Sequence, residues 1–385
     1  MSQQIPVFSR MKQLGVLLGP RQASWSRRRI LGRLLMRKLV FLSPYGAPGT
    51  NGLCDHVDQI VAALADRNLP AIEKIGVASS EHEVDISRGV LLQGDSRGLD
   101  YLLNQFVTSD CTLVVHYVGY SYQRRGCPFS LVRSLRRLRS FRNFRMISVF
   151  HETYASGPPW TSTFYVAPFQ RLLFRALVNL SDKVVTSTPT YMRTLERTGK
   201  QTGTHPVISN VGEPPDPCEL NRRANRAVVF GLPPSRRRLF GSGMLERAVR
   251  SLCVDEVVEI GECYSERPPN IAGVRWRQCG ELSGKEVSEL FLQSRFGLLH
   301  YPPNFLLKSG VFAAYSSHRM VPVLLAQPGS RVEELRPHTH YLDSSDMGSM
   351  DDKTLQGVAD ECWRWYVSTR SLAVCRKLYI EWCRD

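Results

Sequence analysis

Several motifs of metal-dependent and disulfide-rich proteins are missing from this sequence. Its 10 cysteines form no Cys-x-x-Cys pair and no Cys/His cluster at zinc spacing. An Asp-x-Asp pair is absent as well. We therefore expect mostly buried, reduced cysteines, as in a cytoplasmic protein, and chemistry that requires no metal ion.

Long apolar runs are also missing, since no stretch reaches the roughly 18 apolar residues that indicate a transmembrane helix. Hydrophobic residues make up 43% of the chain and charged residues 22%, as in soluble globular proteins. A length of 385 residues exceeds one typical domain, so we expect two domains.

Acidic residues are absent from residues 1–38, although this segment is rich in Lys and Arg. The whole chain has 50 basic and 35 acidic residues, a formal net charge of +15, and much of the basic excess lies here. Apolar residues alternate with the arginines of residues 27–37, a pattern typical of a basic amphipathic surface helix. The alternatives are that residues 1–35 form a disordered extension, or that they precede a true start at Met36.

A second segment without acids runs from Arg124 to Arg145 and is rich in arginine. Leu131, Leu135 and Leu138 share one helical face, which leaves the arginines on the others. A solvated helix face is the usual explanation, and a patch for an anionic membrane surface or a lipid-phosphate acceptor is the more specific one. Nucleic acid ranks behind both, because no RNA-binding signature, zinc finger or helix-turn-helix accompanies the patch.

Strand and helix patterns alternate along most of the chain. Apolar strands precede a Pro- and Gly-rich linker at 206–225, and a second series of strands begins just after it. We expect an α/β protein with two doubly wound, Rossmann-like parallel-sheet domains and a cleft between them. The expected boundaries are an N-terminal domain at 36–205, a C-terminal domain at 226–365 and a final helix at 366–385.

Residues 302–325 are the most informative segment, because they read as a strand end, a loop, a helix and a short buried strand. Lys308, Ser309 and Gly310 fall where that helix begins. Backbone amides at a helix start and a lysine charge form an anion site, at the sheet edge where open α/β folds bind ligands. The segment therefore favours a nucleotide or nucleotide-sugar enzyme, and an ordinary core helix is the alternative.

Three places in the chain resemble the GT-B glycosyltransferases, in particular the retaining, nucleotide-sugar-dependent enzymes of the family 4 type. Residues 51–65 are similar to their glycine-rich first loop and the following helix. His151 and Glu152 end a strand where that family places a substrate-contacting tip, and residues 307–322 match its donor-binding helix and strand. The resemblance implies a final helix that returns toward the N-domain, a nucleoside-diphosphate sugar as co-substrate, and no cofactor or metal.

The chain departs from this family at two positions where glutamates usually support the donor sugar. Counting back from Pro322, these positions hold Leu307 and Tyr315. Lys308 or Tyr315 would have to take over the missing role. The departure leaves open whether the reaction retains or inverts the anomeric configuration.

The candidate site residues take roles that combine this resemblance with their own chemistry. His151 is the candidate base or sugar-hydroxyl ligand, because a histidine near its ordinary pKa can accept a proton at neutral pH, and Glu152 is a candidate general base. A structural histidine, solvated arginines and a plain tight turn are the simpler explanations. Other candidates are Lys308, Ser309, Gly310, Arg236 and Arg237 for the donor diphosphate, Gly261, Glu262, His300, Tyr301 and Tyr315 for the nucleotide or sugar pocket, and Gly49, Asn51 and Gly52 for the N-domain glycine loop.

The resulting hypothesis is a metal-independent, hexosyltransferase-like glycosyltransferase of polysaccharide biosynthesis. It would move a sugar from its donor to a hydroxyl of a saccharide or lipid-linked glycan, in the cytoplasm or at the inner face of a membrane. Trp160, Tyr165 and Phe169 are expected in the core or lining the acceptor site. The alternatives are a catalytically silent GT-B-like partner protein that binds a nucleotide sugar or glycan, and an epimerase of the same fold.

Overall fold

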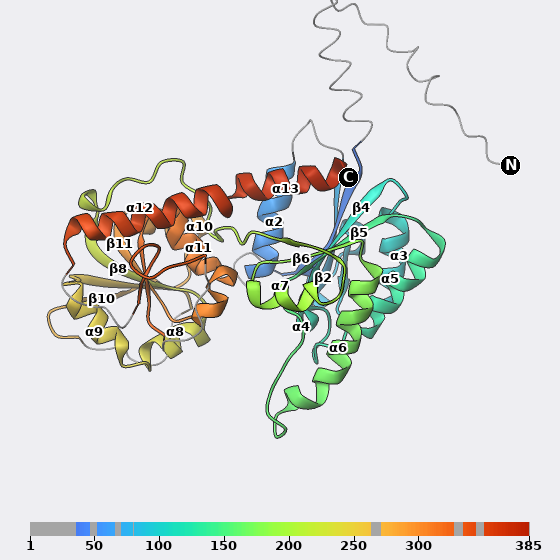
Figure 1. The fold of residues 1–385 in the computed structure, drawn as a ribbon, viewed down its shortest axis with the longest axis horizontal. Coiled ribbons are helices and arrows are strands. Elements are labelled where there is room, and N and C mark those ends of the chain that lie inside the picture. Colours follow the sequence, from blue (N-terminus) through green and yellow to red (C-terminus); the bar gives the residue numbers. More distant parts are fainter. Residues whose placement is uncertain are drawn as a thin grey trace, which may run out of the picture.

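The computed structural model describes residues 36–46, 52–65, 71–79, 81–262, 271–326, 334–343 and 350–384, which form two parallel sheets flanked by helices (Figure 1). The N-terminal sheet has 7 strands in the order β3-β2-β1-β4-β5-β6-β7, and each ladder between them is parallel. Its strands are β1 (Lys38–Tyr45), β2 (Ile72–Ala78), β3 (Val90–Leu92), β4 (Cys111–Tyr117), β5 (Arg145–Phe150), β6 (Lys183–Thr186) and β7 (Gln201–Thr204). Its helices are α2 (Gly52–Leu64), α3 (Ser96–Phe106), α4 (Gly119–Tyr122), α5 (Phe129–Phe141), α6 (Ser162–Leu180) and α7 (Pro189–Glu196).

The C-terminal sheet has 6 strands in the order β10-β9-β8-β11-β12-β13, again with parallel ladders. The prediction of two doubly wound parallel-sheet domains is therefore confirmed. Its strands are β8 (Ala224–Phe230), β9 (Glu256–Ile260), β10 (Arg275–Gln278), β11 (Ser294–Leu299), β12 (Val321–Leu324) and β13 (Leu342–Asp343). Its helices are α8 (Pro233–Phe240), α9 (Met244–Ser251), α10 (Gly284–Leu292), α11 (Gly310–Ser317) and α12 (Asp352–Thr369), and the chain ends in α13 (Leu372–Arg384).

Helices cover both faces of the N-terminal sheet, so its central strands are buried along nearly their whole length and are mostly apolar. Successive residues of β1 point to opposite faces. Val40 and Leu42 pack on the side of α3 and α5, whereas Leu39 and Phe41 pack against α2 and α13. The C-terminal sheet follows the same rule, since neighbouring residues of β8 pack on the side of α9 or on the side of α10 and α11.

The chain crosses back to the N-terminal domain between α12 and α13, which run one after the other along one side of the molecule (Figure 1). Tyr379 and Trp382 of α13 are buried against the N-terminal sheet. The hydroxyl of Thr112 on β4 donates a hydrogen bond to the Trp382 carbonyl at 3.2 Å. The last helix thus completes the core of the first domain.

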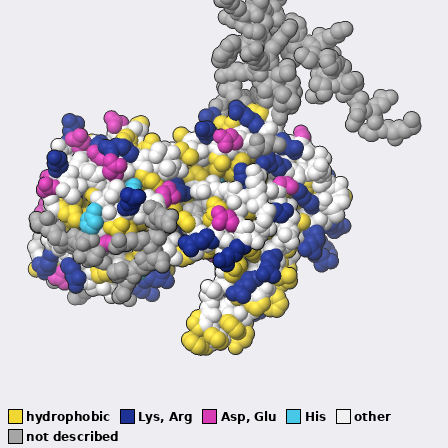
Figure 2. Space-filling view, in the orientation of Figure 1, with side chains coloured by type: hydrophobic (Ala, Val, Ile, Leu, Met, Phe, Trp, Pro, Cys, Tyr) yellow, Lys and Arg dark blue, Asp and Glu magenta, His cyan; other side chains and the backbone are white. Residues whose placement is uncertain are grey.

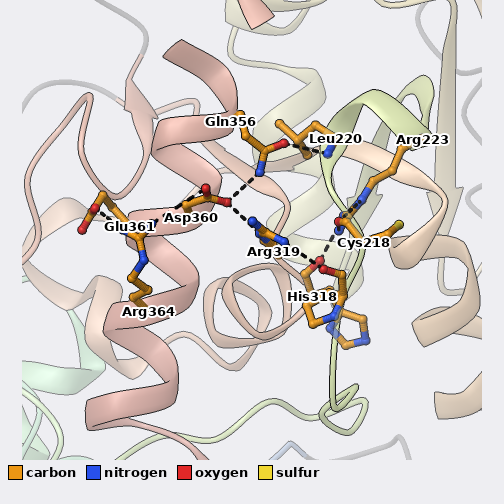
Figure 3. A network of polar contacts seen from close by, with 10 residues as sticks. Cys218, Leu220, Arg223, His318, Arg319, Gln356, Asp360, Glu361 and Arg364 are labelled. Atoms are coloured by element: carbon orange, nitrogen blue, oxygen red, sulfur yellow. Dashed lines mark hydrogen bonds and ion pairs between the residues drawn. The ribbon is translucent and has the colours of Figure 1, made fainter. Parts of the chain in front are cut away.

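The connection between the domains is fixed to the C-terminal domain by two arginines (Figure 3). Arg223 is 7% exposed, and its guanidinium donates to the carbonyls of Ser294 at 3.2 Å and His318 at 3.0 Å. Arg319 donates to Asp360 of α12 at 2.6 Å and to the Pro217 carbonyl of the connection at 3.2 Å. Such contacts hold the last part of the connection against the second domain.

The helix predicted to begin at Lys308, Ser309 and Gly310 is α11, and a short 3₁₀ helix precedes it where the sequence suggested a loop. This 3₁₀ helix spans Pro303–Lys308, and Ser309 between the two helices is the N-cap of α11. The Ser309 hydroxyl accepts a hydrogen bond from the Phe312 amide at 3.1 Å, which favours a new helix start at this point. The break puts Lys308 directly before the first turn of α11.

Two glycines in the C-terminal domain provide a test of how tightly its core is packed. A Cβ at Gly297 of β11 would lie 2.4 Å from the Tyr315 ring, so Gly297→Ala should destabilise the protein by about 1–3 kcal/mol. Gly357 of α12 has no heavy atom within 4 Å of a Cβ, so Gly357→Ala should stabilise it by about 0.5–1 kcal/mol. Urea unfolding measures both, and equal effects of the two substitutions would contradict this packing.

Candidate functional site

The domains meet through residues that follow the C-terminal ends of their strands. Glu152 lies just beyond β5, and Lys308 lies beyond β11 at the end of the 3₁₀ helix. Their side chains form an ion pair with Lys308 Nζ 2.7 Å from Glu152 Oε1. Two residues predicted separately for donor and catalysis are therefore in direct contact across the domain interface.

Aromatic rings surround this ion pair. Lys308 Nζ lies 5.8 Å from the centre of the Tyr191 ring on α7, and Tyr191 contacts Phe305 of the other domain at 5.5 Å between ring centres. Burial, together with the nearby Tyr191 and Glu152, raises the pKa of Tyr301 to about 12. Sequence reasoning missed Tyr191 and Phe305, although Tyr191 follows β6 at the same sheet edge as Glu152 follows β5.

The first turn of α11 has the geometry expected of an anion site. Ser309 caps the Phe312 amide, whereas the amides of Gly310 and Val311 precede the positions that have an acceptor within the helix. Gly231, at the end of β8, has a φ of 127° and would place a Cβ 3.4 Å from Val311. The end of β8 therefore approaches the start of α11 closely.

Arg236 plays a different part from the one predicted. Its guanidinium is 1% exposed, and Nη1 pairs with Glu259 of β9 at 2.6 Å. Nε donates to the Gly231 carbonyl at 3.0 Å, and Nη2 donates to the Glu262 carbonyl. Glu259 balances the charge of Arg236, and the two carbonyl contacts show that Arg236 supports the loops that follow β8 and β9. Arg237 beside it is exposed.

Tyr315 does not lie in a pocket. Its side chain is fully buried, and its hydroxyl accepts from the Phe230 amide at 3.1 Å and donates toward the Val228 and Leu298 carbonyls at 3.2 and 3.3 Å. Burial raises its pKa well above the ordinary value. The prediction that Tyr315 substitutes for a donor-binding glutamate is therefore wrong, because the ring fills the space between α11 and the sheet.

The remaining pocket candidates lie at strand ends. Gly261 and Glu262 follow β9, with Gly261 at a φ of 122° and Glu262 exposed. His300 follows β11 and is partly buried, which lowers its pKa. Gly52 is the first residue of α2. The other two members of the N-domain glycine loop, Gly49 and Asn51, lie outside the described residues.

Histidines gather at the edge of the N-terminal sheet, close to the domain interface. His56, His116, His151 and His205 have ring centres between 5.3 and 6.3 Å apart. His205 Nε2 lies 2.9 Å from the Tyr379 hydroxyl, which lies 3.0 Å from His116 Nε2, and His116 Nδ1 lies 3.0 Å from His151 Nε2. A polar chain thus connects α13 to His151.

Burial lowers the pKa of His116, His151 and His205 well below the ordinary value, and nearby histidines lower it further for all three. The prediction that His151 titrates near neutral pH is therefore wrong. His151 is neutral at pH 7 and offers a hydrogen-bond donor or acceptor rather than a charge. The sequence shows these histidines at separate strand ends, but only the fold brings them together.

Within the described ranges, no group of three or more His, Cys, Asp and Glu side chains has the geometry of a metal site. The same part of the chain contains no helix that is long and apolar enough to cross a membrane. Trp160, Tyr165 and Phe169 are 83%, 67% and 54% exposed, so they do not lie in the core. The alternative, that they line an acceptor site, stays a prediction.

No family model and no curated protein matches the sequence. Solved structures do match: an α-glucosyltransferase (AGT) in complex with UDP has a TM-score of 0.59 at 11% identity and covers 91% of this chain and 100% of its own. The trehalose-6-phosphate synthase OtsA matches with a TM-score of 0.59 at 13% identity, over 90% of this chain and 99% of that one. A UDP-forming trehalose-phosphate synthase from Burkholderia xenovorans has a TM-score of 0.57 at 13% identity, over 91% and 99%.

These similarities define the class of fold: two parallel-sheet domains in the GT-B-like arrangement of these glycosyltransferases. At such low identity they show the fold alone. The resemblance to the family 4 enzymes in particular stays a prediction.

The histidine cluster makes stability depend on pH. His56 is buried with no hydrogen-bond partner for either ring nitrogen, and burial lowers its pKa from 6.5 to about 4. The unfolded state therefore binds more protons between these values, and stability falls as the pH drops through them. This residue alone should cost about 2 kcal/mol between pH 7 and pH 5.

His56→Leu should therefore reduce the loss of stability between pH 7 and pH 5, measured by urea unfolding. The control is His338→Asn, because His338 is exposed and has a φ of 58°, which Asn tolerates. That control should keep the pH dependence of the parent. Equal slopes for the parent and His56→Leu would show that His56 is not buried in neutral form.

Proposed function

We propose that this protein is a glycosyltransferase that moves a sugar from a nucleoside-diphosphate sugar to a hydroxyl of a saccharide or lipid-linked glycan. The observation that carries the proposal is the contact of Lys308, at the start of α11, with Glu152 of the other domain. A lysine beside a helix start suits a diphosphate, and a carboxylate facing it suits a reacting hydroxyl. The GT-B-like fold supports this assignment.

The donor diphosphate would lie against the first turn of α11. Gly310 and Val311 would offer backbone amides, Ser309 would hold the turn in place, and Lys308 would supply positive charge. Fixed positive charge of this kind stabilises the negative charge that develops on a departing nucleotide. Gly231 has no side chain, so the close end of β8 does not place one over the first turn of α11.

The ion pair between Lys308 and Glu152 implies a competition. An incoming diphosphate would take the ammonium of Lys308 and release the Glu152 carboxylate. Glu152 would then be available to accept a proton from the acceptor hydroxyl or to hold the sugar. Closure of the domains over the donor would exclude water from the reaction.

His151 would contact the donor sugar or the acceptor as a neutral imidazole. Its Nε2 faces His116, so the polar chain through Tyr379 would fix which nitrogen carries the proton. In this proposal the missing glutamates of the second domain are replaced by groups of the first. His300, Tyr301, Gly261 and Glu262 would line the nucleoside side, and uracil nucleotides are the first to test because similar structures hold UDP.

A catalytically silent binding protein of the same fold is the second candidate. The observation that favours it is that Leu307 and Tyr315 are both buried in the core, so neither can support a donor sugar. This candidate would bind a nucleotide sugar without turnover. An activity assay with a cognate donor distinguishes the enzyme from the silent binding protein. If it is an enzyme, we expect it to work in the cytoplasm or at the inner face of a membrane.

Lys308→Ala should weaken nucleotide binding. A nucleoside diphosphate at about 100 times its dissociation constant adds about 2.7 kcal/mol of stability, so thermal unfolding with UDP and other nucleotides should show a raised midpoint in the parent. The shift should disappear in Lys308→Ala. Lys285→Ala is the matched control, because the Lys285 side chain is 87% exposed on α10, and it should keep the shift.

Loss of the shift in both variants would point to an unspecific charge effect. A folded parent with no shift for any nucleotide would contradict the donor site itself.

Glu152→Gln should separate binding from transfer. Removing the carboxylate frees Lys308 for the diphosphate, so nucleotide affinity should rise about threefold to tenfold, as expected for a partly exposed ion pair. Sugar transfer should fall by about 100-fold if Glu152 acts as the base. Calorimetry measures the first effect and product formation the second, and a variant with weaker nucleotide binding would overturn the competition.

A further inference from the structure

The first half of α6 and the loop before it project from the body of the N-terminal domain (Figure 1). Apolar side chains gather at the end of this projection, and Lys and Arg lie along it (Figure 2). We call this apolar group the aromatic arm. Its members and their exposed fractions are Trp160 (83%), Phe164 (46%), Tyr165 (67%), Phe169 (54%) and Leu172 (60%).

The aromatic arm is one continuous surface. Tyr165, Phe169 and Leu172 are spaced for one face of α6. The opposite face, with Phe174 and Val178, is buried against the domain, so the helix is anchored and the arm is not part of the core. Phe129 of α5 extends the surface: its ring centre lies 6.3 Å from that of Phe169, and it is 50% exposed. A contiguous apolar patch of this kind on a folded protein marks an interaction site.

The segment that carries the arm is almost entirely basic, although Asp100 of α3 pairs with Arg137. Between Asp110 and Asp182 the only acidic residue is Glu152, and Glu152 is paired with Lys308. Neither α5 nor α6 contains an acid. The exposed arginines of this part of the domain are Arg124, Arg125, Arg133, Arg136, Arg137, Arg171 and Arg175.

We infer that the aromatic arm docks the protein on an anionic lipid bilayer. Trp and Tyr prefer the interface between water and lipid, and Phe and Leu enter the apolar region below it. Arginines beside them would meet negatively charged headgroups. A nucleic acid would account for the arginines but not for Leu172 and Phe164 at the exposed end. The inference concerns this surface alone and does not depend on the identity of the donor.

Binding of the full chain to vesicles tests the apolar contribution. The probes are vesicles of phosphatidylcholine alone and of phosphatidylcholine with phosphatidylglycerol, measured by flotation. The double variant Trp160→Ser/Tyr165→Ser should bind the anionic vesicles about tenfold more weakly, because partitioning scales with the apolar area inserted. The control Tyr101→Ser removes an aromatic side chain that is 59% exposed on α3, and should bind as the parent does.

The basic contribution needs its own pair of variants. Arg133→Gln/Arg136→Gln should weaken binding to anionic vesicles and reduce its dependence on salt. Arg247→Gln/Arg250→Gln removes the same charge from α9 in the other domain and should leave binding unchanged. Equal losses for the two pairs would mean that net charge alone attracts the protein, and would overturn the docking surface.

Fluorescence shows whether the arm enters the lipid. Emission of the parent should shift to shorter wavelength with anionic vesicles, and Trp160→Phe should abolish the shift. Full vesicle binding by the Trp160→Ser/Tyr165→Ser variant would overturn the inference, since residues 1–35 or another surface would then carry binding. Tight binding of a labelled DNA duplex without vesicle binding would also overturn it and assign the surface to nucleic acid.

Discussion

The arrangement of the two domains depends on one carboxylate, because the chain passes between them twice and Glu213 ties the two passages together. Glu213 Oε1 accepts hydrogen bonds from the Tyr366 hydroxyl of α12 at 2.6 Å and from the Leu372 amide of α13 at 2.7 Å. Burial raises its pKa, which is the cost of placing a carboxylate here. The same Tyr366 hydroxyl accepts from the Ser209 amide at 2.8 Å. Together with the ion pair of Lys308 and Glu152, this junction connects the two domains at a second place.

The sequence was sufficient for the architecture and for part of the site. Apolar strands that alternate with helices predict two parallel sheets, and the edge where their strands end predicts where Lys308 and Glu152 lie. The sequence could not show that these two side chains are in contact, because they are 156 positions apart and their contact depends on how the domains pack. The sequence also could not predict the burial of Arg236, because nothing in a run of three arginines indicates which one pairs with Glu259 in the core.

Tyr315 shows why a resemblance in pattern does not transfer a role. A polar residue at a family's catalytic position can turn toward the sheet, and here the hydroxyl finds backbone partners in β8 and β11 instead of a ligand. Gly297 leaves the space that the ring occupies. Helix and strand periodicity predict which face a residue is on, but not whether a large side chain near the boundary fills the core or a pocket. For Trp160 the sequence left two alternatives open, the core and the acceptor site, and the exposed side chain excludes the core.

The docking of α13 also affects how this chain can fold during synthesis. Tyr379 packs against Phe41 with ring centres 5.3 Å apart, and Tyr379 and Trp382 cover a face of the first sheet. A ribosome makes the N-terminal end first, at about 5–20 residues per second. Leu39 and Phe41 can pack against α2 early, but the part of this face that α13 covers stays open until the whole second domain has been made. The first core can therefore be completed only after α13, the last helix of the chain, has been made.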